Sequence, residues 1–535
     1  MGPVEQQVDQ LFARWDRPDS PGAALAVIRD GAIVYSRGYG MADLEHGVPI
    51  TPASVFDIAS TSKQFTALAV LLLAREGRVA LDGDIRVYLP EMPGYGRPIT
   101  VRHLLHHTSG IRDYLELLQL AGLSFEFDYD EQEIVDMLAR QKRLNFRPGE
   151  EFLYSNSGYF LLSEIVHRAS GQTLGAFAQE RILQPLGMAA TRFYDDFTMI
   201  VPHRAIGYTR RREGGYATAL FKFDLLGDGG VLTTVEDLAR WDANFYANRL
   251  GGGAELLAQM HTVGVLNSGE PLDYACGLVV GRYRGLPLVS HSGGWAGYTA
   301  ELIRFPEQRL SVICLANLDE VPSPELARRV AGLYLAGEME PEERPTAPAA
   351  VELPEEALAA YAGAYRSQQS GRVYRLVLEQ GRLVFRHPAG YGVALVPLGA
   401  DRFQTEAGGW IGFTAAFAPA GPDRPRQMLL TPDNDPPLTL DEVPLPAVDA
   451  AALPEYAGRY YSPELRVAYH LEARDNALWL RVGYAPPTLL EYVGGDDWQF
   501  KAMMVHFTRG RSGQVSGLEM RTGRAHGVRF GKRTG

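Results

Sequence analysis

At residues 60–74 the chain reads Ser-Thr-Ser-Lys-Gln-Phe-Thr-Ala-Leu-Ala-Val-Leu-Leu-Leu-Ala. Its large apolar side chains recur at helical spacing, with alanines between them: Phe65, Leu68, Leu71 and Leu72. Gly77 follows where a helix C-terminus favours glycine. The segment is apolar on nearly every side, which predicts a helix buried at the centre of a domain.

The first four residues of this segment, Ser60 to Lys63, form an S-x-x-K motif. Three residues make about one helical turn, so the two side chains lie on the same face. A serine hydroxyl needs a base beside it to act as a nucleophile. A lysine is that base only where burial and nearby positive charge depress its pKa. The helix N-terminus adds positive potential and backbone N–H groups for an oxyanion. The alternative for this motif alone is an N-cap serine beside a surface lysine.

A second motif, Y-x-N, is formed by Tyr154-Ser-Asn156 shortly after Pro148-Gly-Glu150. A tyrosine hydroxyl can relay a proton between Ser60 and a leaving group. The amide of Asn156 combines a donor with an acceptor, which suits it to hold both Lys63 and a substrate amide. The alternative is a turn that contains an incidental tyrosine.

A third motif, H-x-G, is His291-Ser-Gly293-Gly294, on or beside a late strand. Glycine at this place lets a substrate backbone approach the strand edge. The N–H of Gly294 could complete an oxyanion hole with the N–H of Ser60. For this motif alone, a glycine-rich turn between two strands is the favoured interpretation.

The order S-x-x-K, Y-x-N, H-x-G resembles that of the penicillin-recognising serine hydrolases, in the branch of class C β-lactamases, D,D-peptidases and esterases. The flanking segments Phe56-Asp-Ile-Ala-Ser60 and His103-Leu-Leu-His-His-Thr-Ser-Gly110 resemble the same branch. The resemblance covers residues from about 5 to 335. It implies an enzyme that needs no metal and no cofactor.

The resemblance also implies roles for individual residues. Ser60 would form an acyl-enzyme, while Lys63 and Tyr154 would share the general base and acid steps. The implied substrate-binding residues are Asn156, His291, Gly293 and Gly294. His291 replaces the lysine that β-lactamases use to bind a substrate carboxylate. An imidazole is only partly charged near neutral pH, so peptidase or esterase activity is favoured over efficient β-lactam hydrolysis.

The pattern of expected elements predicts an α+β fold, an α/β sandwich in which an antiparallel sheet is flanked by helices, over residues 1–336. Residues 23–29 and 32–39 read as a hairpin joined by Asp30-Gly31, a type I′ turn signal. Four later strands and a closing helix are expected at residues 277–282, 286–290, 300–305, 310–315 and 323–335. The strands thus come from both ends of the domain and the helices from its middle.

Residues 337–352 are rich in proline and acid and read as a linker. The chain then repeats itself: Leu353-Pro-Glu precedes Tyr361-Ala-Gly-Ala-Tyr365, and Leu453-Pro-Glu precedes Tyr456-Ala-Gly-Arg-Tyr460. Short alternating strands follow each copy. We therefore expect two small β-barrel accessory domains, at residues 353–448 and 449–535.

Within the family, the segments at residues 62–66 and 109–114 and the two trailing β-units resemble D-stereospecific aminopeptidases. These enzymes combine one catalytic domain with two β-barrels. The resemblance implies that a loop of the last barrel carries an acid for the substrate amine. The corresponding loop would be residues 482–497, with Asp496 or Asp497 as the acid. A solvated Gly-Gly-Asp-Asp turn is the alternative.

Composition excludes several other classes of function. The formal net charge is −12, which disfavours binding to nucleic acid. The most apolar run is about half the ~20 residues that a membrane span needs. The pair His106-His107 lacks a third ligand at a recognisable spacing, so no metal site is expected. Cys276 and Cys314 lie in apolar segments and are expected as buried free thiols. With no visible signal peptide, this predicts a cytoplasmic location, although a removed leader would leave the same sequence.

The leading hypothesis is a serine hydrolase that cleaves a small peptide, amide or ester. D-amino-acid peptides or amides are the substrates that this hypothesis favours. A broad carboxylesterase or a weak β-lactamase is the alternative within the enzymes. A non-catalytic penicillin-binding-like recognition protein is the alternative outside them. The duplicated β-unit could recognise cell-wall material or form a homodimer, and the sequence leaves both open. Arg112 and Asp113 are either substrate contacts or a surface ion pair.

Overall fold

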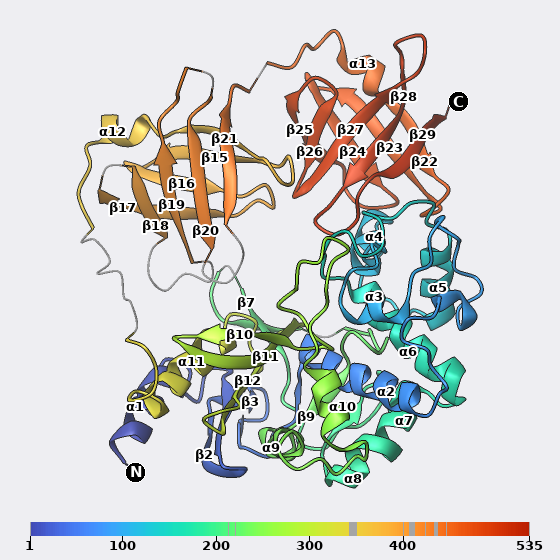
Figure 1. The fold of residues 1–535 in the computed structure, drawn as a ribbon. Helices are drawn as coiled ribbons and strands as arrows, with labels where there is room; N and C mark the ends of the chain where they lie inside the picture. The colour runs from blue at the N-terminus through green and yellow to red at the C-terminus, as the bar shows by residue number, and fades with distance from the viewer. Residues whose placement is uncertain are drawn as a thin grey trace. The chain divides into compact units, whose positions relative to one another are not determined.

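The computed structural model describes residues 2–211, 213–219, 221–341, 350–399, 401–405, 412–422, 424–432, 437–445 and 447–533. The chain divides into two units (Figure 1). The first comprises Met1–Leu115 and Leu123–Glu342, and the second comprises Glu116–Gly122 and Glu343–Gly535. Residues 342–349, half of the predicted linker, lie outside the described residues. The finer domain limits stay a prediction.

The first unit is built around an antiparallel sheet with the strand order β10-β11-β12-β13-β1-β2. The strands are β1 (Ala23–Arg29), β2 (Ala32–Tyr39), β10 (Val279–Tyr283), β11 (Leu286–Trp295), β12 (Tyr298–Phe305) and β13 (Leu310–Ala316). β1 pairs with β13 from Ala23 opposite Ala316 to Arg29 opposite Leu310. The predicted α+β class and the union of early and late strands in one sheet are confirmed.

The predicted hairpin is confirmed as well. Asp30 and Gly31 have φ angles of 52° and 80°. Two successive positive φ angles define the type I′ turn, whose twist matches that of the flanking strands. Arg29 consequently lies opposite Ala32 across a two-residue loop.

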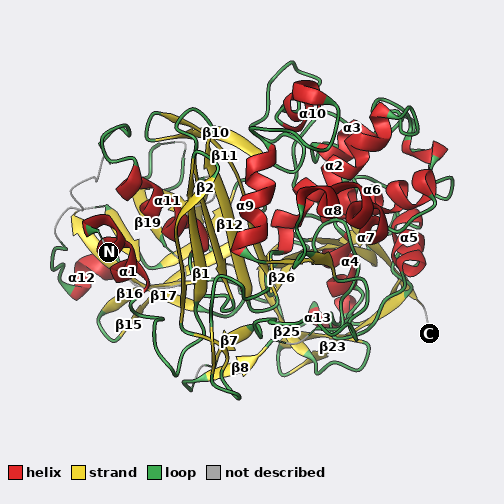
Figure 2. Ribbon diagram, turned by 90° about the horizontal axis from the view of Figure 1, so that it is seen from below, coloured by secondary structure: helices red, strands yellow, loops and turns green. Residues whose placement is uncertain are grey.

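Helices cover both faces of this sheet (Figure 2). On one face, α1 (Pro3–Phe12) and α11 (Ser323–Tyr334) bury apolar residues such as Phe12 and Val330 against β1, β12 and β13. On the other face, α9 (Val235–Asn244) contacts β1 and β13. Beyond α9 lie the other helices of the unit. This layered arrangement matches the predicted α/β sandwich.

The predicted central helix is α2 (Lys63–Arg75), which packs against α6 (Asn156–Ser170). All of its residues from Lys63 to Leu73 are buried. Gly77 has a φ of 71°, two residues after the helix ends, as expected for a C-terminal glycine. Ser60, however, lies outside the α-helix, in the short 3₁₀ helix η1 (Ala59–Ser62).

The remaining elements of this part of the chain are short. The helices are η2 (Ile85–Val87), α3 (Val101–Leu105), α4 (Tyr114–Leu120), α5 (Glu131–Ala139), α7 (Leu174–Ala178), η3 (Gln179–Leu183), α8 (Gln184–Leu186) and α10 (Gly253–Met260). The strands are β3 (Met41–Asp43), β4 (Val48–Pro49), β5 (Phe56–Asp57), β6 (Arg192–Phe193), β7 (Tyr208–Arg210), β8 (Tyr216–Thr218) and β9 (Val231–Thr233). β9 pairs with β5 and β6 in a small sheet, and β5 lies just before Ser60 in the chain.

The second unit contains two closed eight-stranded barrels, drawn in orange and red in Figure 1, which confirms the predicted pair of β-barrels. The first consists of β14 (Gly363–Ser367), β15 (Val373–Glu379), β16 (Arg382–Arg386), β17 (Gly392–Gly399), β18 (Arg402–Thr405), β19 (Phe413–Ala418), β20 (Gln427–Pro432) and β21 (Leu438–Val443). The second consists of β22 (Gly458–Ser462), β23 (Val467–Arg474), β24 (Ala477–Val482), β25 (Thr488–Gly494), β26 (Asp497–Phe500), β27 (Met503–Arg509), β28 (Val515–Arg521) and β29 (Val528–Arg533). A short helix precedes each barrel: α12 (Glu355–Ala359) and α13 (Leu453–Tyr456).

The repeated tyrosine motif has a repeated structural role. The hydroxyl of Tyr365 donates to the carbonyl oxygen of Tyr361 at 2.9 Å. The hydroxyl of Tyr460 donates to that of Tyr456 at 2.7 Å. Each contact fixes the first strand of its barrel to the segment before it. The two barrels are therefore copies in local contacts as well as in sequence.

The same repeat includes an aspartate. Tyr361 donates from its hydroxyl to Asp401 at 2.9 Å, and Tyr456 donates to Asp496 at 3.0 Å. Asp496 also accepts two hydrogen bonds of 2.8 Å from Arg509. Asp497 lies 2.7 Å from Nδ1 of His506. Both carboxylates are thus engaged within the second barrel, and a role in binding a substrate amine stays a prediction.

In the part of the chain that the structure describes, no helix is both long and apolar enough to span a bilayer.

Candidate active site

Ser60 is presented by a tight turn between β5 and α2. Ala59, just before it, has a φ of 45°, a left-handed conformation that is costly for any residue with a Cβ. The backbone N–H of Ala59 donates to Oδ1 of Asp57 at 2.7 Å. Burial raises the pKa of Asp57 to about 6, although the cation of Arg204 opposes the shift. The Asp57 contact therefore holds a strained turn that places Ser60, partly exposed, at a cavity.

Lys63 lies one turn after Ser60 and is fully buried. Its Nζ donates to Oγ of Ser60 at 3.0 Å and to Oδ1 of Asn156 at 3.0 Å. It also donates to the backbone carbonyl oxygen of Asp228 at 2.7 Å. An ammonium has three N–H donors, which matches these three acceptors. The side chains of Ser60 and Lys63 thus meet as the S-x-x-K spacing predicted.

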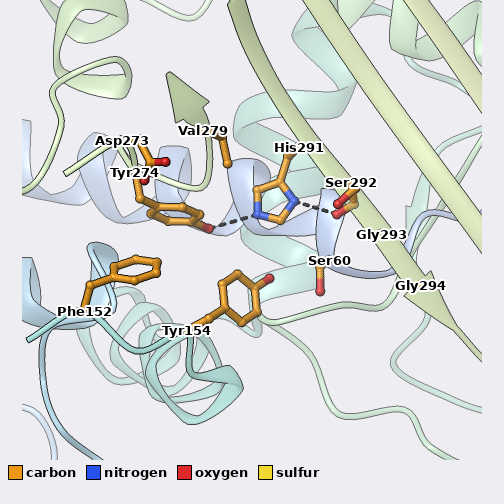
Figure 3. A pocket seen from close by; sticks show the side chains of 10 residues that line it. All are labelled: Ser60, Phe152, Tyr154, Asp273, Tyr274, Val279, His291, Ser292, Gly293 and Gly294. Atoms are coloured by element: carbon orange, nitrogen blue, oxygen red, sulfur yellow. Dashed lines mark hydrogen bonds between the residues drawn. The ribbon is translucent and has the colours of Figure 1, made fainter. Parts of the chain in front are cut away.

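The Y-x-N motif lies at the start of α6 and contributes two groups. The ring of Tyr154 lies with its centroid 4.8 Å from Nζ of Lys63. Figure 3 shows its hydroxyl pointing toward Ser60. Asn156, at the first position of α6, donates from its backbone N–H to Oδ2 of Asp113 at 2.7 Å. Asp113 consequently orients the asparagine whose side chain holds Lys63.

His291 lies on β11 with both ring nitrogens engaged. Nδ1 is 2.6 Å from the carbonyl oxygen of Ser292, and a carbonyl only accepts, so Nδ1 carries the hydrogen. Nε2 is 3.0 Å from the hydroxyl of Tyr274. Burial raises the pKa of Tyr274 well above its usual value, so its hydroxyl stays protonated. Burial and the nearby cation of Lys63 lower the pKa of His291 to about 4. At neutral pH this ring is therefore uncharged and accepts a hydrogen bond from Tyr274.

Gly293 and Gly294 differ in what surrounds them. A Cβ on Gly293 would lie 2.1 Å from the carbonyl oxygen of Ile58, so the nucleophile turn packs directly on its backbone. A Cβ on Gly294 would meet nothing within 4 Å. β10 pairs only with residues 286–290 of β11. The part of β11 from His291 to Trp295 therefore continues past the end of β10, beside the turn that carries Ser60.

These groups line one cavity of about 410 Å³ (Figure 3). Its lining residues are Ser60, Phe152, Tyr154, Asp273, Tyr274, Val279, His291, Ser292, Gly293 and Gly294. All the residues expected to bind substrate line it except Asn156, whose side chain accepts from Lys63. None of these lining residues is a lysine or an arginine. The described residues that line the cavity therefore include no fixed cation for a substrate carboxylate.

The sequence matches the family described as Beta-lactamase over residues 8–336. This chain belongs to the beta-lactamase family. Penicillin-binding protein 4* of Bacillus subtilis is 32% identical over 409 residues, which cover 72% of this chain and 88% of that protein. The D-aminopeptidase of Cereibacter sphaeroides is 28% identical over 487 residues, which cover 89% of this chain and 87% of that enzyme. A solved relative is the octameric penicillin-binding protein homologue from Pyrococcus abyssi, with a TM-score of 0.58 and 27% identity over 82% of this chain and 98% of that one.

As a member of the beta-lactamase family, the protein is a serine hydrolase. The predicted resemblance to this family is confirmed, and so is the resemblance to D-aminopeptidases. The match to the D-aminopeptidase extends well beyond residue 336, so it includes sequence of the barrels as well as the hydrolase domain. Among the described residues, no group of three or more potential ligands could hold a metal ion.

The sequence did not predict several residues that contact Lys63 or His291 at this site. Asp228 holds Lys63 through its backbone, and burial raises the pKa of its carboxyl to about 6. The glycine-rich segment around it, residues 227–230, carries no motif that marks a contact with a lysine. Tyr274 had no motif to mark it. Arg112 and Asp113 are both buried, so the surface ion pair considered for them is wrong.

Proposed function

We propose that the protein hydrolyses amide bonds of small D-amino-acid peptides or amides through an acyl-enzyme on Ser60. The observation that carries the proposal is the contact of Lys63 with both Ser60 and Asn156, each at 3.0 Å, with the hydroxyl of Tyr154 facing the same serine. The similarity to a D-aminopeptidase along 89% of the chain supports the substrate class.

In the proposed first step, the oxygen of Ser60 attacks the substrate carbonyl carbon while its proton passes to the oxygen of Tyr154, which reacts as a phenolate beside the ammonium of Lys63. The backbone N–H groups of Ser60 and Gly294 stabilise the oxyanion that forms. The C–N bond then breaks, and the proton returns through Tyr154 to the leaving amine. This step leaves the D-amino acid as an ester on Ser60.

In the proposed second step, a water molecule attacks that ester and gives its proton to the oxygen of Tyr154, again beside the ammonium of Lys63. The ester bond breaks, the free D-amino acid leaves, and Ser60 recovers its hydrogen. Each step moves one proton and needs no oxidant, metal or cofactor.

The neutral state of His291 supports a preference among substrates. β-Lactams and C-terminal D,D-peptides carry a carboxylate, which a fixed cation binds well and an uncharged imidazole binds poorly. Amides and esters without that carboxylate need no cation from the residues that line the cavity. We therefore place D-amino-acid amides before β-lactams as substrates.

Covalent labelling tests the nucleophile. We expect a fluorophosphonate to add one label to the intact protein, as read by mass spectrometry, and the label to be absent in Ser60→Ala. Ser62→Ala is the matched control, since Ser62 lies in the same 3₁₀ turn and its Oγ accepts from the N–H of Val231 at 3.1 Å. Unchanged labelling of Ser60→Ala would contradict the proposed role of Ser60.

We further propose a cytoplasmic location and self-association. Two buried free thiols, Cys276 and Cys314, are compatible with a reducing compartment. The Pyrococcus abyssi relative is octameric, which favours a homo-oligomer over a monomer, with a dimer as the smallest form. Cell fractionation and light scattering test these two points, and a monomer at micromolar concentration would contradict the second.

A further inference from the structure

Four aromatic side chains gather at the end of β11 and are called here the aromatic cluster: Phe125, Phe221, Phe223 and Trp295. The ring of Trp295 lies at centroid distances of 5.3 Å from Phe125, 5.8 Å from Phe221 and 5.4 Å from Phe223. Phe125 and Phe223 also meet, at 5.8 Å. The rings come from three separate segments, so the cluster is a product of the fold.

The aromatic cluster stays partly open to solvent. Phe221 is 36% exposed, and Phe125, Phe223 and Trp295 are only partly buried. Nearby residues of the core of this unit, such as Tyr298, are almost fully buried. Aromatic rings that remain at a surface in contact with one another commonly mark a binding site for an apolar group.

One edge of the aromatic cluster adjoins β11, the strand that carries Gly294. Trp295 directly follows Gly294, which lines the catalytic cavity. Side chains alternate along a strand, so Trp295 lies on the same face of β11 as His291 and Gly293. That face packs on the nucleophile turn, because Gly293 approaches the carbonyl of Ile58. The indole is therefore on the side of the sheet that carries Ser60.

The opposite edge of the aromatic cluster adjoins the segment that holds the lysine. The ring of Phe223 stacks on Tyr114 at 6.1 Å with an interplanar angle of 10°. The hydroxyl of Tyr114 donates to the carboxylate of Asp228 at 3.1 Å. The backbone of Asp228 in turn accepts from Lys63. The cluster is thus bounded on two sides by residues that contact catalytic groups.

The placement of Tyr154 decides which part of a substrate would reach the aromatic cluster. In Figure 3, Tyr154, Tyr274 and His291 lie on one side of Ser60 and Gly294 lies on the other. In the proposed reaction Tyr154 protonates the leaving amine, so the leaving group occupies its side. The acyl residue then extends the other way, past Gly294 toward Trp295.

We propose that the aromatic cluster binds the side chain of the acyl residue, so that the enzyme prefers D-amino acids with aromatic or large apolar side chains over D-alanine. The inference rests on the proposed function and names its substrate class. Burying an aromatic side chain against these rings removes apolar surface from water and adds ring–ring contacts. Because this contact lies on the acyl side, it is kept through both steps of the reaction.

The test compares kcat/KM for D-phenylalanine amide with that for D-alanine amide. We expect the wild-type ratio to exceed about ten, the scale by which apolar pockets separate substrates. Trp295→Ala and Phe221→Ala should each lower the ratio several-fold. The ratio is the readout because a loss of folded enzyme lowers both rates equally. Phe127→Ala is the matched control, since Phe127 lies in the segment of Phe125, outside the cluster, and is 57% exposed.

A second series separates the two sides of the substrate. D-alanine amide and D-alanine anilide differ only in the leaving group, and their rate ratio should be the same in Trp295→Ala as in the wild type. The assignment to the acyl side is overturned if Trp295→Ala changes this leaving-group ratio but leaves the ratio of D-phenylalanine amide to D-alanine amide unchanged. A conservative variant, Phe223→Leu, keeps the test open if Trp295→Ala fails to fold.

The remaining outcomes are distinct. A wild-type ratio near one, with both amides hydrolysed, overturns this inference and leaves the proposed function standing. Hydrolysis of neither amide, with Ser60 still labelled by a fluorophosphonate, overturns the proposed function and this inference with it. A change of assembly mass in Trp295→Ala without a change of the ratio would assign the aromatic cluster to an interface between copies of the chain.

Discussion

The hydroxyl of Tyr274 lies 3.0 Å from Nε2 of His291. Since the other ring nitrogen faces the carbonyl oxygen of Ser292, the hydrogen of the neutral ring is on Nδ1 and Tyr274 is the donor. This pair sets the electrostatic character of the cavity. A lysine at the same place would present a cation to the substrate, whereas this histidine presents an uncharged ring.

The uncharged state of His291 predicts a pH dependence of stability. Its pKa is lowered to about 4 in the folded protein, below the ordinary value of about 6.5. As the pH falls, His291 therefore takes up its proton in the unfolded chain before it does so in the folded protein. Its contribution to stability is fully present above pH 6.5 and is lost as the pH falls through 4. Between pH 7 and pH 5, we expect the free energy of unfolding of His291→Gln to fall by about 2 kcal/mol less than that of the wild type.

Urea unfolding of the two proteins at both pH values measures this difference. Burial likewise lowers the pKa of His106, which is buried, and of the half-buried His261 to about 4, so these two residues contribute equally to both proteins and cancel in the comparison. Parallel loss of stability in wild type and variant would show that His291 does not titrate as described.

Lys63 should be needed for the chemical step. Lys63→Ala removes the donor that joins Ser60 to Asn156, and loss of a positioned acid–base group typically lowers kcat by 10²- to 10⁴-fold. Lys142→Ala, a change at an exposed lysine, is the control and should leave kcat near the wild-type value. Single-turnover kinetics with a D-amino-acid ester would show whether the loss of rate lies in the acylation step. Retention of more than a tenth of kcat in Lys63→Ala would argue against its proposed role.

A methyl group on Gly293 should displace the nucleophile turn. The new Cβ would lie 2.1 Å from the carbonyl oxygen of Ile58, and backbone atoms cannot yield as a flexible side chain can. We expect Gly293→Ala to lower both activity and the thermal midpoint. Gly281→Ala places a methyl group in open space on the neighbouring strand β10 and should change neither. Equal behaviour of the two variants would contradict the close packing at Gly293.

The strained turn before Ser60 predicts a trade between stability and activity. Glycine adopts a φ of 45° at little cost, so Ala59→Gly should raise stability by roughly 0.5–1 kcal/mol. The looser turn should lower kcat, because it no longer fixes Ser60 against Lys63. Calorimetry and steady-state kinetics on the same preparation measure both effects.

Asp57 provides the complementary change. Asp57→Ala removes the acceptor for the N–H of Ala59, which lies 2.7 Å away, and should lower kcat with little effect on KM. Asp57→Asn keeps a carbonyl oxygen at that place and should restore most of the loss. If Asp57→Asn is as poor as Asp57→Ala, the carboxylate charge matters more than the hydrogen bond.

Local patterns were sufficient to predict much of the fold. The apolar run of α2 and the Asp30-Gly31 turn each depend on neighbours a few residues apart, and both were predicted correctly. The start of α2 was placed three residues early, because the left-handed Ala59 leads into a 3₁₀ turn and nothing in its residue type signals that conformation.

The candidate site was predicted less completely. Ser60 and Lys63 are one turn apart, so their contact follows from spacing alone. Asp228 reaches Lys63 from 165 residues along the chain, and Tyr274 meets His291 only because β11 returns past it. Contacts of this kind depend on the packing of distant segments, which no short motif records.

The most direct test of the account is the hydrolysis of D-alanine amide and L-alanine amide by the wild type and by Ser60→Ala, followed by chromatography of the released amino acid. The account predicts that the wild type releases D-alanine at least about tenfold faster than L-alanine, and that Ser60→Ala releases neither. Equal rates for the two enantiomers, or undiminished release by Ser60→Ala, would contradict it.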